Sequence, residues 1–189
     1  MKKFSSFLLF ILVAGLINAQ TVWENDPYHT RMEFRVTHWL VNTVSGNFNR
    51  AEFVVDKNRE DFTKSSLTFS ADVASINTNV DIRDEDLRSP NFFDAKKYPK
   101  LTFKSSKIVE VAKRVYDVSG DLTMHGVTKP VTVRLYDRGL SKNNDDNTIQ
   151  GYHVRATLNR FDYGIGTENP ISEISEKVEI TGDFEMLKR

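Results

Sequence analysis

The chain has 189 residues, and its 26 Lys and Arg residues balance 26 Asp and Glu residues, so its formal net charge is zero. This balance argues against a nucleic-acid-binding protein with a dominant basic surface, and 39% hydrophobic with 11% aromatic residues is too much for a disordered chain. The sequence has no cysteine, which excludes disulfides, cysteine-ligated zinc, iron–sulfur clusters and a cysteine nucleophile.

The first residues differ in composition from the rest of the chain. Two lysines precede the uncharged run FLLFILVAGLI at Phe7–Ile17, and Ala19 supplies a small residue at the expected cleavage site. This pattern is typical of a secretory signal peptide, whereas an anchor helix of eleven residues would rise only about 16 Å, roughly half of a bilayer core. The sequence predicts a signal peptide at 1–19 and a mature domain at 20–189. We expect this domain to reach the periplasm or to be secreted, and no later stretch is apolar enough to span a membrane.

The mature chain alternates between apolar and polar residues in eight successive segments. In the first segment, from Thr30 to Trp39, one side carries Met32, Phe34 and Val36 while the other carries charged residues. Period two with one apolar side is typical of a strand that buries one face. The eight predicted strands lie at 30–39, 44–55, 67–73, from 101, 116–124, 131–135, 152–158 and 178–186.

Two local features interrupt the strand pattern. The apolar side changes within the second strand, which predicts a β-bulge near Asn49–Arg50. The segment Asp81–Arg88 has a helical composition and predicts one short helix between the third and fourth strands, followed by a second turn. Its charges suit either a polar rim or a solvated face on which Asp84 and Arg88 form an i,i+4 pair.

Eight antiparallel strands with one helical crossover predict an all-β fold, closed into an eight-stranded barrel. Such a barrel is either filled by side chains or holds one small ligand. Large apolar residues on the inward side are by themselves expected to fill a core. Gly46, Gly120 and Gly182 on the same side permit strand bending or leave space. An apolar lumen would suit a long hydrophobic molecule, at about 0.8 kcal/mol for each buried CH₂ group.

Few polar groups stand out as site candidates. His38 falls on an inward side and is either the anchor for a ligand head group or a core histidine bonded to a backbone carbonyl, Asp84 or Arg83. Phe92 and Phe93 are adjacent, so in a helical turn we expect one to plug the barrel and the other to contact ligand, unless both are core residues. The sequence contains no H-x-H, H-E-x-x-H, G-x-S-x-G, P-loop or G-x-G-x-x-G motif, so we predict no metal, no catalytic residues and no catalytic cofactor.

Several longer segments resemble one known family. RDEDLRSPNFFDAKKYPKLTF at Arg83–Phe103 is similar to the central signature of the YceI-like proteins, and GDLTMHGVTKPV at Gly120–Val131 is similar to their second signature. The segments Trp23–Trp39 and Leu158–Gly166 resemble, respectively, the first strands of this family and the residues before its final strand. The resemblance covers essentially the whole mature chain. These are lipocalin-like, polyisoprenoid-binding proteins of the bacterial periplasm.

The resemblance implies an extended, lipocalin-like barrel whose apolar lumen holds a long isoprenoid or another lipid-like chain. Two departures are small: Thr30 stands where Ser is common, and Met124 stands where a branched aliphatic residue is common. The inward side of the strands and the matched signature positions together give the predicted ligand-binding residues, which are Phe34, Val36, His38, Phe48, Phe69, Arg83, Leu87, Phe92, Phe93, Phe103 and Leu122.

The sequence therefore favours an exported binding protein that sequesters or carries a long-chain isoprenoid, a quinone or a fatty amide, and that is not an enzyme. The alternatives are an enzyme or redox partner acting on a bound isoprenoid quinone, for which His38 is the best candidate, and a ligand-free interaction module. We expect no nucleic-acid partner. A homodimer through an exposed strand edge or the helical segment stays open.

Overall fold

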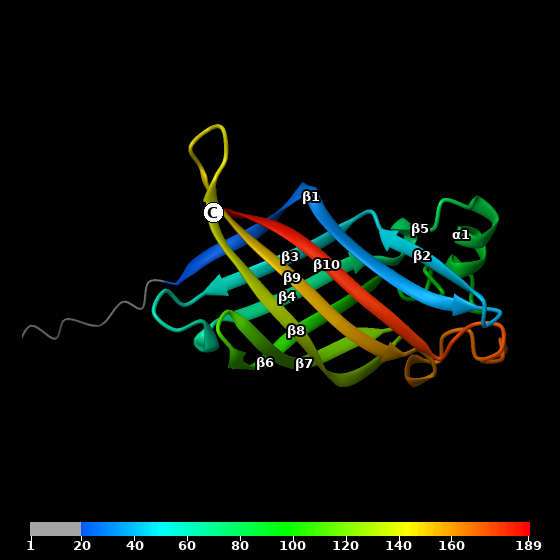
Figure 1. The fold of residues 1–189 in the computed structure, drawn as a ribbon. Coiled ribbons are helices and arrows are strands. Elements are labelled where there is room, and N and C mark those ends of the chain that lie inside the picture. The colour runs from blue at the N-terminus through cyan, green and yellow to red at the C-terminus, as the bar shows by residue number, and fades with distance from the viewer. Residues whose placement is uncertain (1–19) are drawn as a thin grey trace, which may run out of the picture.

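The computed structural model describes residues 20–189, so the predicted signal peptide at 1–19 lies outside the described residues. Figure 1 shows an elongated barrel of long strands with one short helix at one end. No helix in the described part of the chain has the length and apolar character needed to cross a membrane. The strands are β1 (Thr21–His38), β2 (Asn42–Phe48), β3 (Ala51–Lys57), β4 (Ser66–Asp72), β5 (Ile76–Asn77), β6 (Lys100–Ala112), β7 (Val115–Met124), β8 (Val127–Lys142), β9 (Thr148–Asn159) and β10 (Lys177–Lys188). The helix α1 covers Asp81–Arg88, and the 3₁₀ turns are η1 (Phe62–Lys64), η2 (Val73–Ser75) and η3 (Arg160–Tyr163).

The sheet closes because the last strand pairs with the first, with Phe34 of β1 opposite Ile180 of β10. Strands β2 and β3 pair with two different parts of β1, so together they occupy one strand position of the ring. Strand β5 pairs with β2 and strand β4 pairs with β3, so β4 and β5 together occupy the next position. The result is the closed, eight-stranded antiparallel barrel with one short helix that the sequence predicts.

The predicted bulge at Asn49–Arg50 is wrong in kind, although the apolar side does change there. The chain ends β2 before these residues and begins β3 after them. The Asn49 amide donates to the Ser75 carbonyl at 3.0 Å, and the Asp72 amide donates to the Arg50 carbonyl at 3.0 Å. Because both backbone groups bond to the corner between β4 and β5 instead of to β1, the strand breaks.

Aromatic side chains fill the barrel at the end that carries η1. The Phe62 ring packs against the rings of Tyr116 and Tyr152, with centroids 4.6 Å and 5.8 Å away. Nearby, the Phe53 and Phe184 rings lie 4.6 Å apart. Burial also raises the pKa of the Tyr152 phenol, so this side chain stays neutral. This end of the barrel is therefore a packed core.

Helix α1 covers the opposite end and is attached there by buried polar contacts. The Asp84 side chain is buried, at 6% exposure, and accepts hydrogen bonds from the amide and the hydroxyl of Thr78 at 2.8 and 2.6 Å. Arg88 donates to the Ile76 carbonyl at 3.3 Å. The i,i+4 pairing considered for Asp84 and Arg88 is therefore wrong, because both side chains bind the segment that precedes the helix.

Candidate ligand-binding site

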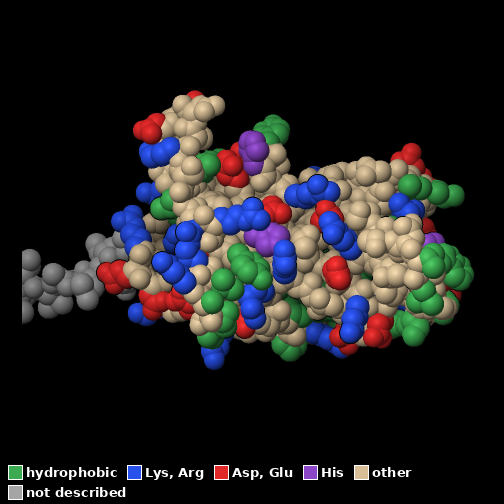
Figure 2. Space-filling view, in the orientation of Figure 1, with side chains coloured by type: hydrophobic (Ala, Val, Ile, Leu, Met, Phe, Trp, Pro, Cys, Tyr) green, Lys and Arg blue, Asp and Glu red, His purple; other side chains and the backbone are tan. Residues whose placement is uncertain are grey.

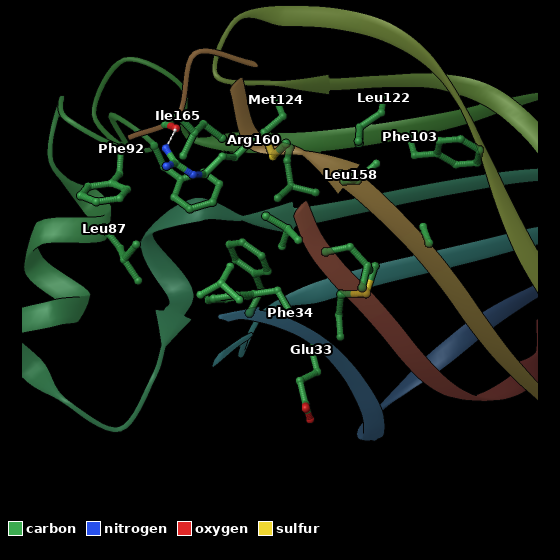
Figure 3. A pocket seen from close by; sticks show the side chains of 18 of the residues that line it. Glu33, Phe34, Leu87, Phe92, Phe103, Leu122, Met124, Leu158, Arg160 and Ile165 are labelled. Carbon is green, nitrogen blue, oxygen red and sulfur yellow. Dashed lines mark hydrogen bonds between the residues drawn. The ribbon is translucent and has the colours of Figure 1, made fainter. Parts of the chain in front are cut away.

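A cavity of about 330 Å³ lies inside the barrel on the α1 side of the aromatic core (Figure 3). Inward side chains of the strands form its wall, and its deepest part reaches Phe53 and Phe184. Exposed Asp86 of α1 and half-exposed Glu173 line its outer end, so the cavity opens to solvent beside the helix. Most of the wall consists of Phe, Leu, Ile, Val and Met side chains, which favour a ligand with a long apolar part.

Three glycines of the wall explain how large rings can line a cavity without filling it. A Cβ atom at Gly46 would lie 2.5 Å from the Phe34 ring, and one at Gly182 would lie 2.6 Å from the Phe184 ring. At Gly120 the same atom would lie 2.6 Å from the ring of Phe103. Each ring therefore lies against the backbone of a glycine on the wall, and the space inside the barrel remains open.

The structure brings all of the predicted ligand-binding residues to the same cavity. Their contact with a ligand remains a prediction. These cavity-lining residues are Phe34, Val36, His38, Phe48, Phe69, Arg83, Leu87, Phe92, Phe93, Phe103 and Leu122.

The expectation that Phe92 and Phe93 face different surroundings is wrong, because both side chains line the cavity. These residues lie in turns after α1 rather than in a helix, so successive side chains can converge. The Phe93 ring meets the Phe48 ring edge-on at 6.0 Å, and the Phe48 ring lies 5.9 Å from the Phe34 ring. Together these rings form an aromatic wall beneath the helix.

His38 ends β1 at the outer part of the cavity. Its ring packs edge-on against Trp39, with centroids 5.9 Å apart. Asp84 and Arg83, the two side chains considered as partners of this histidine, both bind Thr78 instead. His38 is thus placed where it could meet a polar part of a ligand.

Arg83 supplies a cation of fixed position near the mouth of the cavity. Its Nε atom donates to the Thr78 hydroxyl at 2.8 Å, and its Nη2 atom donates to the Thr78 carbonyl at 3.0 Å. Because Thr78 also donates to Asp84, the cation, hydroxyl and carboxylate form one connected group. This arrangement fixes the orientation of the Arg83 guanidinium.

Arg160 is a cavity residue that the sequence reasoning missed. Its side chain is buried, at 4% exposure, and stacks over the Phe161 ring at 4.0 Å. Its guanidinium donates only to backbone carbonyls of the segment 165–175, including that of Ile165 at 3.0 Å (Figure 3). Burial lowers the pKa of Arg160. One signal was present, because Arg160 continues the inward side of Val154, Ala156 and Leu158.

The residues 164–176, which we call the mouth loop, depend on this arginine for their shape. The Arg160 Nη2 atom donates to the carbonyls of Asn169 at 2.6 Å and Ile174 at 3.0 Å. Asn169, Glu173 and Ile174 of the loop also line the cavity. Arg160 therefore positions one side of the opening.

A separate polar group lies outside the cavity. Asp26, His29 and Glu185 bring three potential metal-ligand atoms within 4.8 Å of one another. The His29 Nδ1 and Asp26 Oδ2 atoms are 3.0 Å apart, and this hydrogen bond raises the pKa of His29 and lowers that of Asp26. No sequence motif reveals this group, because Asp26 and His29 lie on β1 whereas Glu185 lies on β10. It contributes nothing to the apolar cavity.

Comparison with known proteins adds evidence of descent and fold. A family model described as a YceI-like domain matches residues 23–186. A UPF0312 protein of Staphylococcus aureus is 35% identical over 141 residues, which is 74% of this chain and 80% of the relative. The crystal structure of Burkholderia cenocepacia BcnA has a TM-score of 0.76 at 22% identity and covers 85% of this chain and 98% of its own. A polyisoprenoid binding domain from Saccharophagus degradans has a TM-score of 0.68 at 17% identity, covering 90% of this chain and 100% of its own.

Proposed function

The chain belongs to the YceI-like family, and on this premise we propose that it binds a long isoprenoid or related lipid-like molecule inside the barrel. The observation that carries the proposal is the cavity of about 330 Å³, whose wall is apolar and whose polar side chains lie mainly near the mouth. The neighbouring structure described as a polyisoprenoid binding domain supports this ligand class, because it has the same fold. A quinone or a fatty amide with a long chain belongs to the same class of shape and polarity.

In the proposed complex, the apolar chain of the ligand lies along the inward rings, and its polar head stays near the mouth. Each CH₂ group removed from water contributes about 0.8 kcal/mol, so chain burial supplies most of the affinity. His38 and Arg83 are the proposed contacts of the head, because both line the outer part of the cavity. The hydrogen bonds from Arg83 to Thr78 fix the orientation of the guanidinium that would contact the polar head.

We further propose that the protein is an exported carrier rather than an enzyme. The composition of residues 1–19 supports export to the periplasm, and the mature domain would then begin at residue 20. The ring of His38 packs against Trp39, and the Asp84 carboxylate accepts a hydrogen bond from Thr78. Because these two groups contact other residues and not each other, the geometry favours holding a ligand over activating it. The carrier would sequester its cargo without a catalytic cofactor.

The test compares two substitutions on neighbouring residues of β9. Ala156 lines the cavity, whereas Thr157 is exposed on the outside of the barrel. The delipidated protein is titrated with a polyprenol or an isoprenoid quinone, and uptake is measured by native mass spectrometry. We expect Ala156→Phe to weaken binding by about tenfold or more, corresponding to about 1.4 kcal/mol, because the added ring occupies ligand space. Thr157→Phe should bind like the unmodified protein.

Other results would contradict the carrier proposal. If the unmodified protein takes up neither polyprenol, quinone nor fatty amide, the barrel is an interaction module. If bound quinone is converted to product and His38→Ala stops the conversion, the protein is an enzyme. Equal uptake by the Ala156→Phe and Thr157→Phe variants would place the ligand outside the cavity. The same spectra measure the oligomeric state, for which a homodimer stays a prediction.

A further inference from the structure

Large apolar side chains project into solvent around the mouth of the cavity. In the turn between β1 and β2, Leu40 is 71% and Val41 is 87% exposed, and Trp39 beside them is 56% exposed. Ile82 of α1 is 78% exposed, and Ile171 of the mouth loop is also exposed. Figure 2 shows hydrophobic side chains gathered at this end of the molecule. We call these five residues the apolar rim.

The turn between β1 and β2 carries bulky side chains at backbone positions where such residues are unfavourable. Trp39 has a φ of 49° and Leu40 a φ of 61°, which is the left-handed region that favours glycine and asparagine. A bulky side chain in this region strains the backbone and therefore destabilises the turn. The stability of the hairpin would therefore favour other residues here, so the apolar side chains point to a role outside the fold.

The segments of the rim are placed around one opening. The Trp39 amide donates to the Glu173 carbonyl at 2.8 Å, and the Ser175 amide donates to the Thr37 carbonyl at 2.9 Å. These bonds hold the β1–β2 turn beside the mouth loop. Glu173 itself lines the cavity, as do residues of α1, so the rim surrounds the mouth. The described chain begins and ends at the opposite end of the barrel (Figure 1).

We propose that the apolar rim inserts into the surface of a lipid bilayer, so that the mouth of the cavity faces the membrane. The inference deepens the proposed function and rests on it, because a carrier that docks in this way exchanges its apolar ligand without exposing it to water. Separate tips that carry aliphatic side chains and a tryptophan suit the interfacial region of a bilayer. A flat protein partner would instead favour a continuous apolar face.

The charges near the rim identify the kind of surface. Exposed Asp81, Glu85 and Asp86 lie on α1, and exposed Glu168 lies on the mouth loop. The two cations of α1, Arg83 and Arg88, are half-buried and donate to Thr78 and Ile76, so the exposed charges of the helix are acidic. Acidic groups beside the insertion site repel an anionic membrane, so we assign the rim to a bilayer surface without net charge.

The first experiment measures co-flotation with phosphatidylcholine vesicles. We compare the unmodified protein with the L40S/V41S variant and with the control V111S/L140S, which removes exposed apolar side chains from β6 and β8. We expect L40S/V41S to lower the bound fraction about fivefold or more, because two of the insertion tips become polar. The control should bind like the unmodified protein, and thermal melting of each variant checks that it is folded.

A second measurement uses the two tryptophans of the chain and needs no apolar-to-polar substitution. Trp39 is exposed, whereas Trp23 is buried. Brominated phosphatidylcholine should quench the emission of the unmodified protein, and Trp39→Phe should remove that quenching. Absence of quenching would overturn the insertion. Equal flotation of L40S/V41S and the control would do the same.

Two further results separate this inference from the proposed function. If the unmodified protein takes up detergent-dispersed polyprenol but ignores vesicles, docking is wrong while ligand binding stands, and a protein partner becomes the occupant of the rim. If it binds vesicles through the rim but refuses polyprenol, docking stands and the proposed cargo is wrong. Binding that needs anionic lipid and disappears with salt would overturn the assignment to an uncharged surface.

Discussion

At the scale of single residues, Arg160 connects the barrel to the mouth loop. Its guanidinium is buried and donates to backbone carbonyls from Ile165 to Ser175, without a carboxylate among those acceptors. Hydrogen bonds to a charged group are stronger than those between neutral groups, so this one side chain fixes several otherwise irregular residues. The shape of the cavity mouth therefore depends on one arginine.

Replacing this side chain by Arg160→Met should destabilise the protein by about 3 kcal/mol, because several buried carbonyl groups lose their donor. Urea unfolding measures this loss. Hydrogen exchange should show a selective increase at the amides of the mouth loop. Arg155→Met is the matched control, since Arg155 is exposed on β9, and it should change stability by less than about 0.5 kcal/mol. A mouth loop that exchanges at its normal rate in Arg160→Met would contradict the role assigned to Arg160.

The sequence predicts apolar site residues better than polar ones. Phe34, Phe103 and Leu122 could be predicted to line the cavity, because period-two alternation alone assigns them to the inward face. Arg160 lies on the same inward side, but an arginine near a turn is usually exposed, so its position alone indicates no role. The partners of Asp84 could not be predicted, because Thr78 is bonded only after β5 and α1 fold against each other.

At the scale of elements, the pairing of β6 with β7 requires one glycine. The register of the two strands shifts between Ser105 and Lys107, and Gly120 of β7 lies opposite Ser105. A Cβ atom at Gly120 would overlap the backbone carbonyl oxygen of Lys104 and approach the Phe103 ring. The carbonyl cannot move without disturbing the strand pair, so glycine is needed for this close approach.

We expect Gly120→Ala to destabilise the protein by about 2 kcal/mol, because overpacking against backbone is not relieved by a rotamer change. Gly151→Ala on β9 is the matched control, since its new atom would meet only the Arg138 side chain, at 3.1 Å. The control should stay within about 1 kcal/mol of the unmodified protein. Chemical denaturation compares the two variants, and equal stabilities would show that the strand pair tolerates the added methyl group.

The sequence predicts the eight strand positions of the barrel and their order, but it predicts neither the division of two of them into shorter strands nor the strand ends. Strand β1 begins at Thr21, well before the predicted start at Thr30. The sequence does not predict this first part because Asp26 and Pro27 interrupt the alternation. The structure accommodates this interruption as a register shift against β10 between Asn25 and Thr30. Alternation shows which face a residue has, whereas the extent of pairing depends on a partner strand that is distant in sequence.

At the scale of the whole molecule, the barrel combines a packed half and a hollow half. The packed half contains the aromatic group around Phe62, and the hollow half contains the cavity beside α1. A ligand that binds only the folded state stabilises it by mass action. Occupation of the hollow half should therefore be visible in the stability of the entire barrel.

Saturation with polyprenol at about 100 times its dissociation constant should raise the free energy of unfolding by about 2.7 kcal/mol. For a domain of this size, the thermal midpoint should rise by roughly 5–10 °C, and delipidation should reverse the rise. Calorimetry with and without ligand measures the shift. The Ala156→Phe variant, with its cavity partly filled, should show a much smaller shift at the same ligand concentration. An equal shift in that variant would mean that the stabilising site is elsewhere.

The aromatic rings around Tyr116 and Tyr152 close the barrel at the end opposite α1, so in the described part of the chain the cavity opens beside this helix. A ligand of the proposed kind must then enter tail first and leave head first, along the same path. The depth of the cavity would then limit the length of ligand chain that is buried. A tail that reaches the aromatic rings could go no deeper, and any further length would protrude beyond α1. A molecule with a polar group at both ends would have to bury one of them, so under the proposed function we expect the ligand to be polar at one end only.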